Sequence, residues 1–281
     1  MGNLSEICQQ LQGLQRQRVG LMGSGLALSN HLRANVANIG GYHAGLEESD
    51  RKTRHLEAQK IIDSVLAGET SGISGDVIGL ITAIGHSIKY FEKLLKPIEK
   101  KQLQLAKLLP AVAWVNHPDQ RGFGLSLLAQ IVGECGDLNN YANPGKLWRR
   151  MGCAPYESRK HNRMPSTWRS AKPSLSADEW EDCGYCPRRR ALAFLVGECM
   201  VKLNQGPYRA RYDQAKANAV AKHPEWAGKK DPAKGLHYNF HGNLLTAKLL
   251  LKNLWIVWTG GEKQRETDEA TAAGLLDPVT A

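Results

Sequence analysis

The sequence predicts an all-α protein, and three observations support this fold class. Apolar residues recur at intervals of three and four over long stretches, as on one face of a helix, and Val77, Leu80, Ile81 and Ile84 are an example. No long segment alternates apolar and polar residues with the period of two that is typical of a half-buried strand. Glycine and proline separate the periodic stretches, as helix ends require.

The first predicted segment, residues 1–108, is a helical arm. Its first part is rich in Gln, Arg and Asn and should form two or three helices, with breaks at Gly40–Gly41 and at Gly68–Gly75. Long amphipathic helices commonly associate through their apolar faces. We therefore expect the arm to pair with a second protomer, which would make the protein a homo-oligomer.

A long helix should follow the second break, because apolar residues continue at helical spacing from Val77 to Leu95. Pro97 comes directly after this stretch. Proline lacks the amide donor of the helix and clashes with the preceding turn. We therefore expect Pro97 to bend the helix or to restart it before Ile98–Leu109.

The second predicted segment, residues 109–259, is a helical domain that opens with a hairpin. A tight turn at Arg121, Gly122, Phe123 and Gly124 precedes an apolar helix that starts at Leu125. Paired glycines let a backbone approach a phosphate closely, and the amides at a helix N-terminus point at such an anion. The pattern predicts a helix-hairpin-helix that holds nucleic-acid backbone without reading sequence. A plain helical turn, with glycines for tight packing, is the alternative.

Further helices are expected along this domain. Asn143–Pro144 offers an N-cap followed by proline at the first helical position, for a short helix that runs through Met151 and ends at Gly152. Cys153–Cys186 is rich in proline and poor in periodicity, which predicts a long loop. The remaining expected elements are helices from Pro187 to about Asn204, Tyr208 to His223 and Gly242 to Trp258, and a flexible tail over 260–281.

The charge of the chain favours an anionic partner. The 37 lysines and arginines exceed the 27 acids, for a formal net charge of +10. In residues 146–172 the basic side chains alternate with aromatic ones, and Glu157 is the acid among them. Guanidinium groups bind phosphates and aromatic rings stack on bases, so this segment predicts contacts to DNA or structured RNA, with a solvated basic face as the alternative. With Arg121, the candidate nucleic-acid-binding residues are Lys146, Arg149, Arg150, Arg159, Lys160, Arg163 and Arg169, and Arg188, Arg189 and Arg190 should extend the same surface.

Other classes of protein are disfavoured. No apolar run of membrane-spanning length occurs and the first residues are polar, so we expect a cytoplasmic protein without a membrane partner. The six cysteines are scattered through helical sequence and should be reduced thiols. Cys183 and Cys186 lie too far from His237 and His241 for a common zinc finger, and no group of carboxylates suggests a nuclease metal site. We expect no metal and no cofactor in this chain.

An ordered series of motifs runs from the hairpin to the last apolar helix. Gly122–Gly124 is followed by a helix that ends in Glu134–Asp137, then by Tyr141–Leu147 and Met151–Pro155, and Lys248, Leu249, Leu250 and Trp255 close the series. Over roughly Pro110–Trp258 the chain resembles the C-terminal domain of a bacterial insertion-sequence transposase family. Members of this family join a RuvC-like DEDD nuclease domain to a helical domain that carries a serine. The resemblance implies DNA binding, transposition and recombination for a mobile element.

Two departures from the family qualify what the resemblance implies. Residues 1–108 look helical and lack the aspartates of the nuclease domain, so Mg²⁺ would be needed only by a nuclease partner supplied in trans. The family's serine belongs to a Ser-Gly pair, whereas Ser158 lies slightly early and no glycine follows it. By position Ser158 is the candidate nucleophile, with Arg159 and Lys160 able to stabilise a phosphate, and a surface serine in a basic loop is the alternative.

The sequence favours one functional hypothesis over two alternatives. The favoured hypothesis is a DNA-binding transposase-family protein that lacks self-sufficient cleavage. The first alternative is an active serine recombinase that uses Ser158. The second is a non-catalytic helical scaffold whose basic face serves solubility.

Overall fold

A computed structural model describes residues 3–154, 186–224 and 236–261 of the chain. Within these ranges every regular element is a helix and no strand occurs, so the predicted all-α class is confirmed. The chain divides into two compact units, Leu14–Lys101 and a second that combines Met1–Gly13 with Gln102–Ala281. None of the helices in the described ranges has both the length and the apolar composition needed to cross a bilayer.

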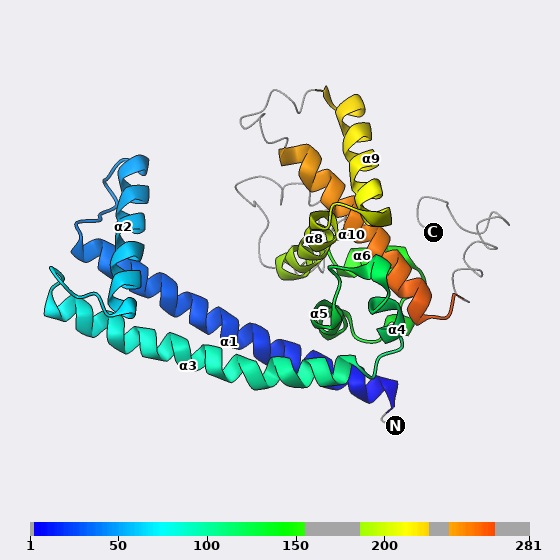
Figure 1. The fold of residues 1–281 in the computed structure, drawn as a ribbon, viewed down its shortest axis with the longest axis horizontal. Helices are drawn as coiled ribbons and strands as arrows, with labels where there is room; N and C mark the ends of the chain where they lie inside the picture. The colour runs from blue at the N-terminus through cyan, green and yellow to red at the C-terminus, as the bar shows by residue number, and fades with distance from the viewer. Residues whose placement is uncertain (1–2, 155–185, 225–235, 262–281) are drawn as a thin grey trace, which may run out of the picture. The chain divides into compact units, whose positions relative to one another are not determined.

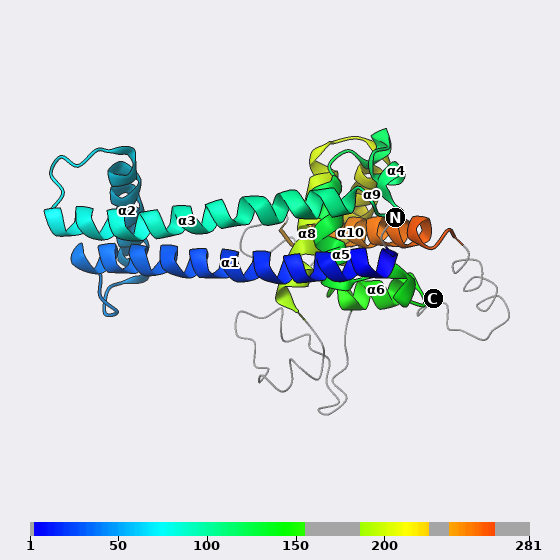
Figure 2. The ribbon, with the colours of Figure 1, turned by 90° about the horizontal axis from the view of Figure 1, so that it is seen from below.

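The unit Leu14–Lys101 is built from three helices, α1 (Leu4–Ile39, shared with the second unit), α2 (Glu48–Ala67) and α3 (Gly75–Ala106). In this unit α1 and α3 run side by side in opposite directions, and α2 packs across both (Figures 1 and 2). The breaks between the helices fall at the two predicted glycine-rich sites. All three helices contribute to one apolar cluster, which is formed by Leu32, Val36, Ala37, Ala58, Ile62, Val65, Val77 and Ile81.

Of the two outcomes expected at Pro97, a bend or a restart, the restart is wrong, because α3 continues through Pro97 to Ala106. A proline inside a helix costs about 3 kcal/mol, mainly through the lost backbone hydrogen bond. Contacts to α1 offset part of this cost, since Leu94, Leu95 and Ile98 are half-buried along the same stretch. Arg18 adds a tie between the helices, with its Nε 2.9 Å from Oε1 of Glu99. Packing against a neighbouring helix therefore outweighs the local preference of proline.

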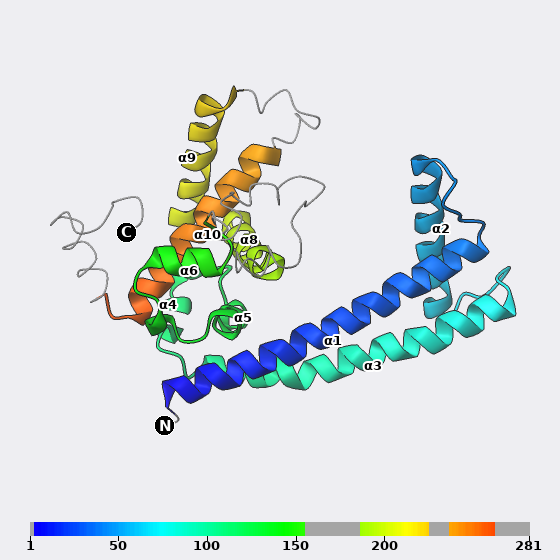
Figure 3. The ribbon, with the colours of Figure 1, turned by 180° about the vertical axis from the view of Figure 1, so that it is seen from behind.

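The described part of the second unit continues after α3 with six α-helices and two short 3-10 helices. The central element is α10 (Leu236–Trp258), which packs against α9, α8, α6 and η2 (Figure 3). It begins at Leu236 rather than at the predicted Gly242. The other elements are α4 (Val112–Val115), η1 (Pro118–Gln120), α5 (Leu125–Cys135), η2 (Leu138–Asn140), α6 (Pro144–Arg150), α8 (Pro187–Lys202) and α9 (Gly206–Lys222).

Three tryptophans fasten α6 and the η2 turn to α10. The indole Nε1 of Trp255 donates to the carbonyl of Tyr141 at 3.1 Å, and that of Trp258 donates to Asp137 Oδ1 at 2.9 Å. In the reverse direction, Trp148 of α6 donates to the carbonyl of Lys248 at 2.9 Å. Trp255 and Trp258 are buried and Trp148 is half-buried, and each indole N–H has an acceptor, which makes these contacts geometrically specific. The bond from Trp148 holds α6 against α10, and α6 carries two of the candidate arginines, Arg149 and Arg150.

Candidate nucleic-acid interface

The turn between η1 and α5 is held by packing as well as by its glycines. Gly122 has a φ of +92°, and a Cβ at this position would lie 2.7 Å from the carbonyl oxygen of Cys199 in α8. Phe123 is fully buried and contacts the ring of Trp114, with 5.9 Å between centroids. Gly122 and Phe123 therefore attach the turn to the core, as the packing alternative predicts, and Phe123 has no exposed ring to offer a base.

All four residues of the turn line a hollow of about 360 Å³, together with residues such as His117 and Gln120. Arg121 and Gly124 are exposed at this hollow. Gly124 is the N-cap of α5 and supplies no side chain to its first amides. Backbone amides at a helix start, beside an arginine, can hold an anion. At this end of α5 the predicted residues thus form a concave, cationic surface.

The packing role of Gly122 gives a first prediction. Gly122→Ala should lower the free energy of unfolding by about 1–3 kcal/mol, because the positive φ and the close carbonyl of Cys199 both oppose a Cβ. Gly124→Ala is the matched control, since nothing lies within 4 Å of its Cβ position and its φ is negative. Urea denaturation followed by circular dichroism measures both variants. Equal stability of the two variants would contradict the assigned packing.

A second cationic surface forms where α6 ends and α8 begins. Arg149 and Arg150 lie in the last turn of α6, and Arg188, Arg189 and Arg190 lie in the first turn of α8. The ends of these two helices lie close together although they are far apart along the chain. Arg190 of α8 donates to the carbonyl of Gly152, 38 positions earlier and just after α6. The first turn of α8 holds no acid, although a helix N-terminus ordinarily favours negative charge.

One buried carboxylate organises this surface, that of Glu134 near the end of α5. Its side chain is 3% exposed. Arg188 donates to both carboxylate oxygens, from Nε at 2.9 Å and from Nη2 at 3.0 Å, and Nε of Arg189 lies 3.4 Å from Oε2. Arg150 donates to the backbone carbonyl of the same glutamate at 3.3 Å. We call Glu134, Arg150, Arg188 and Arg189 the arginine cluster.

Two more cations border the arginine cluster. Arg190 donates to the carbonyl of Gly152 at 2.6 Å, where α6 has just ended. The amine of Lys248 lies 4.9 Å from the centroid of the Trp148 ring, and burial lowers its pKa. Arg188 and Arg189 thus contact the carboxylate of Glu134, while Arg150 and Arg190 donate to nearby backbone carbonyls. These cations are exposed or half-buried, so they form a positively charged surface that an anionic ligand can reach.

Sequence reasoning missed Glu134 and Lys248 as members of this surface. A signal existed for Glu134, which is an acid within the otherwise apolar α5. No local signal marked Lys248, because its role depends on Trp148, which is 100 positions away. Lys146, by contrast, is exposed in the first turn of α6, as its assignment to the surface requires.

Several predicted site residues lie outside the residues that the structure describes. They are the candidate nucleophile Ser158 and the basic residues Arg159, Lys160, Arg163 and Arg169. Among the described residues, no three His, Cys, Asp or Glu side chains are placed to hold a metal ion. The described cysteines are free thiols, and burial raises the pKa of Cys135 to about 12 and that of Cys153 to about 11.

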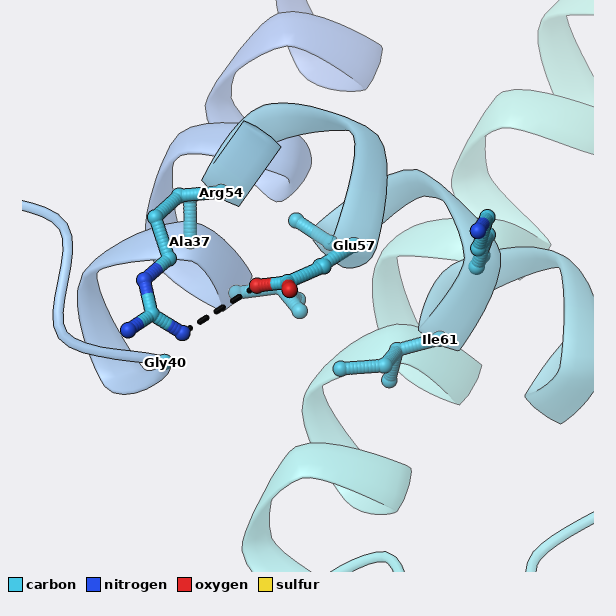
Figure 4. A pocket seen from close by; sticks show the side chains of 8 residues that line it. Ala37, Gly40, Arg54, Glu57 and Ile61 are labelled. Carbon is cyan, nitrogen blue, oxygen red and sulfur yellow. Dashed lines mark hydrogen bonds and ion pairs between the residues drawn. The ribbon is translucent and has the colours of Figure 1, made fainter. Parts of the chain in front are cut away.

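A further hollow, in the unit Leu14–Lys101, differs in chemistry. It has a volume of about 350 Å³, and apolar residues such as Ala37 and Ile61 line it (Figure 4). At its edge Arg54 pairs with Glu57, with 3.1 Å between Nη1 and Oε2. The charge of this arginine is thereby balanced locally, and Lys60 is a further basic residue that lines the hollow.

The comparisons with known proteins add no relative to this description. No family model matches the chain, no curated protein matches it, and no solved structure matches its fold.

Proposed function

We propose that the chain is a DNA-binding, transposase-family protein of a mobile element, which acts in transposition or recombination without self-sufficient strand cleavage. The observation that carries this proposal is the gathering of five arginines at the adjoining ends of α6 and α8, two of which bind the buried carboxylate of Glu134. The ordered motifs from Gly122 to Trp255 support the transposase class.

The ligand on this surface is the sugar-phosphate backbone. Guanidinium groups match phosphate geometry, and the described surface combines them with the exposed Lys146 and with the positive end of the α8 dipole. Contacts of this kind position a protein on nucleic acid but read no sequence. The hollow beside Arg121 and Gly124 supplies another such contact. Structured RNA shares the same backbone chemistry and remains a second ligand to be tested.

A salt series tests the proposal directly. Purified protein is titrated with labelled duplex DNA and with structured RNA from about 50 to 200 mM salt. If five or more phosphates are contacted, the logarithm of the binding constant should fall against the logarithm of salt with a slope of about −4 or steeper, since each contact contributes about −0.9. Absence of binding at the lowest salt would leave the scaffold alternative.

A further inference from the structure

We infer that Glu134 is a positioning residue, which fixes Arg188 and Arg189 as a preorganised fork for nucleic-acid phosphates. The inference rests on the proposed function and adds to it the group that sets the geometry of the site. Sequence reasoning gave this glutamate no role at the interface, and its charge has the wrong sign for direct contact with a phosphate.

The geometry at Arg188 carries the inference. A guanidinium has five N–H donors in a rigid plane. Arg188 uses Nε and Nη2 on Glu134, which leaves the Nη1 edge free of contact with that carboxylate, while 48% of the side chain stays exposed. Two parallel hydrogen bonds to a buried carboxylate allow one orientation of the plane. The remaining donors of this half-exposed side chain therefore have a defined direction before any ligand arrives.

Arg189 is held by the same carboxylate. Its side chain is 16% exposed, and its Nε lies 3.4 Å from the oxygen that Arg188 also reaches through Nη2. The two guanidiniums repel each other, and in the absence of a carboxylate between them they would move apart. Glu134 thus keeps two cations close together at the start of α8, and preorganised contacts bind more tightly because less side-chain entropy is lost on binding.

The direction in which Glu134→Gln changes the affinity for nucleic acid distinguishes a positioning role from an effect of net charge. Glu134→Gln removes a negative charge and so makes the protein more positive by one. If charge alone governed affinity, this variant would bind nucleic acid more tightly. If Glu134 positions the arginines, the variant should bind about tenfold more weakly, with a salt slope smaller in magnitude by one to two contacts of about 0.9 each.

The experiment compares the full-length protein with three variants in the salt series, on the same labelled duplex DNA. Asp213→Asn is the control, because it gives the same charge change at an exposed pair with Arg209, where the Nε to Oδ2 distance is 2.8 Å. Arg188→Lys tests the fork without replacing the buried glutamate, since lysine keeps the charge and lacks the planar pair of nitrogens that binds a carboxylate or phosphate through two parallel hydrogen bonds. Thermal unfolding of each variant shows whether it is folded at the assay temperature.

The outcomes are distinct. Weaker binding and a smaller slope for both Glu134→Gln and Arg188→Lys, with Asp213→Asn unchanged or slightly tighter, would support the positioning role. Tighter binding by Glu134→Gln at an unchanged slope would overturn it and leave the proposed function intact. If Glu134→Gln is unfolded, the Arg188→Lys variant tests the inference instead. Unchanged affinity and an unchanged salt slope in this variant would show that Arg188 does not act as a preorganised fork for phosphates. Failure of the unmodified protein to bind at low salt would overturn both the inference and the proposed function.

Discussion

Replacing Trp255 with alanine is expected to lower the free energy of unfolding by about 3–5 kcal/mol, the typical cost of removing a large aromatic side chain from a core. The ring is fully buried in α10, and its indole nitrogen donates to the carbonyl of Tyr141 at 3.1 Å. The substitution leaves a cavity and an unsatisfied buried carbonyl, and both effects destabilise the folded state. Urea denaturation followed by circular dichroism measures the change.

Trp255→Phe separates the two effects. Phenylalanine keeps most of the ring volume and loses the N–H group, so the variant should be less destabilised than Trp255→Ala, by about 1–3 kcal/mol relative to the unmodified protein. Val257, on the same helix and 36% exposed, provides a surface control, and Val257→Ala should change stability by about 0.5 kcal/mol or less. A loss below about 1 kcal/mol in Trp255→Ala would contradict the central place of α10 in the core.

The second large effect is expected at the end of α6. Arg149→Glu combined with Arg150→Glu should weaken nucleic-acid binding by at least about tenfold near 100 mM salt and should reduce the salt slope by about two contacts. The reason is local, because both side chains lie in the last turn of α6 and Arg150 joins the arginine cluster through the carbonyl of Glu134. Binding across the salt series measures affinity and slope together.

A double charge reversal on α2 serves as the control for the change in net charge. Lys52 and Lys60 are exposed on α2, and their replacement by glutamate gives the same change in net charge. This control should retain the slope of the unmodified protein. Equal loss of affinity in the two double variants would mean that net charge, rather than the surface formed by α6 and α8, attracts the ligand. Unaltered binding by the Arg149 and Arg150 variant would favour the scaffold alternative.

Local rules predicted most of the helices and their ends. Asn143 caps α6, with its Oδ1 accepting from the amide of Lys146 at 3.0 Å, and Pro144 occupies the first turn as expected. Pro187 begins α8 in the same way. Such signals are readable because a cap acts within a few residues of its own position. The same rules also allowed the helix to restart at Pro97, which does not happen, because packing of α3 against α1 outweighs the local cost.

The sequence by itself determined the all-α class, the breaks between the helices of the arm, and the presence of a large excess of basic residues. Only the tertiary structure decided which of these charges share a surface. Arg188 meets Glu134 across 54 positions, and Trp148 meets Lys248 across 100. Composition and periodicity report on neighbours along the chain, whereas these contacts arise from the way α5, α6 and α8 pack around α10. The packing also places Gly122 against α8, where a side chain would meet the carbonyl of Cys199. This glycine of the predicted hairpin therefore has a structural role.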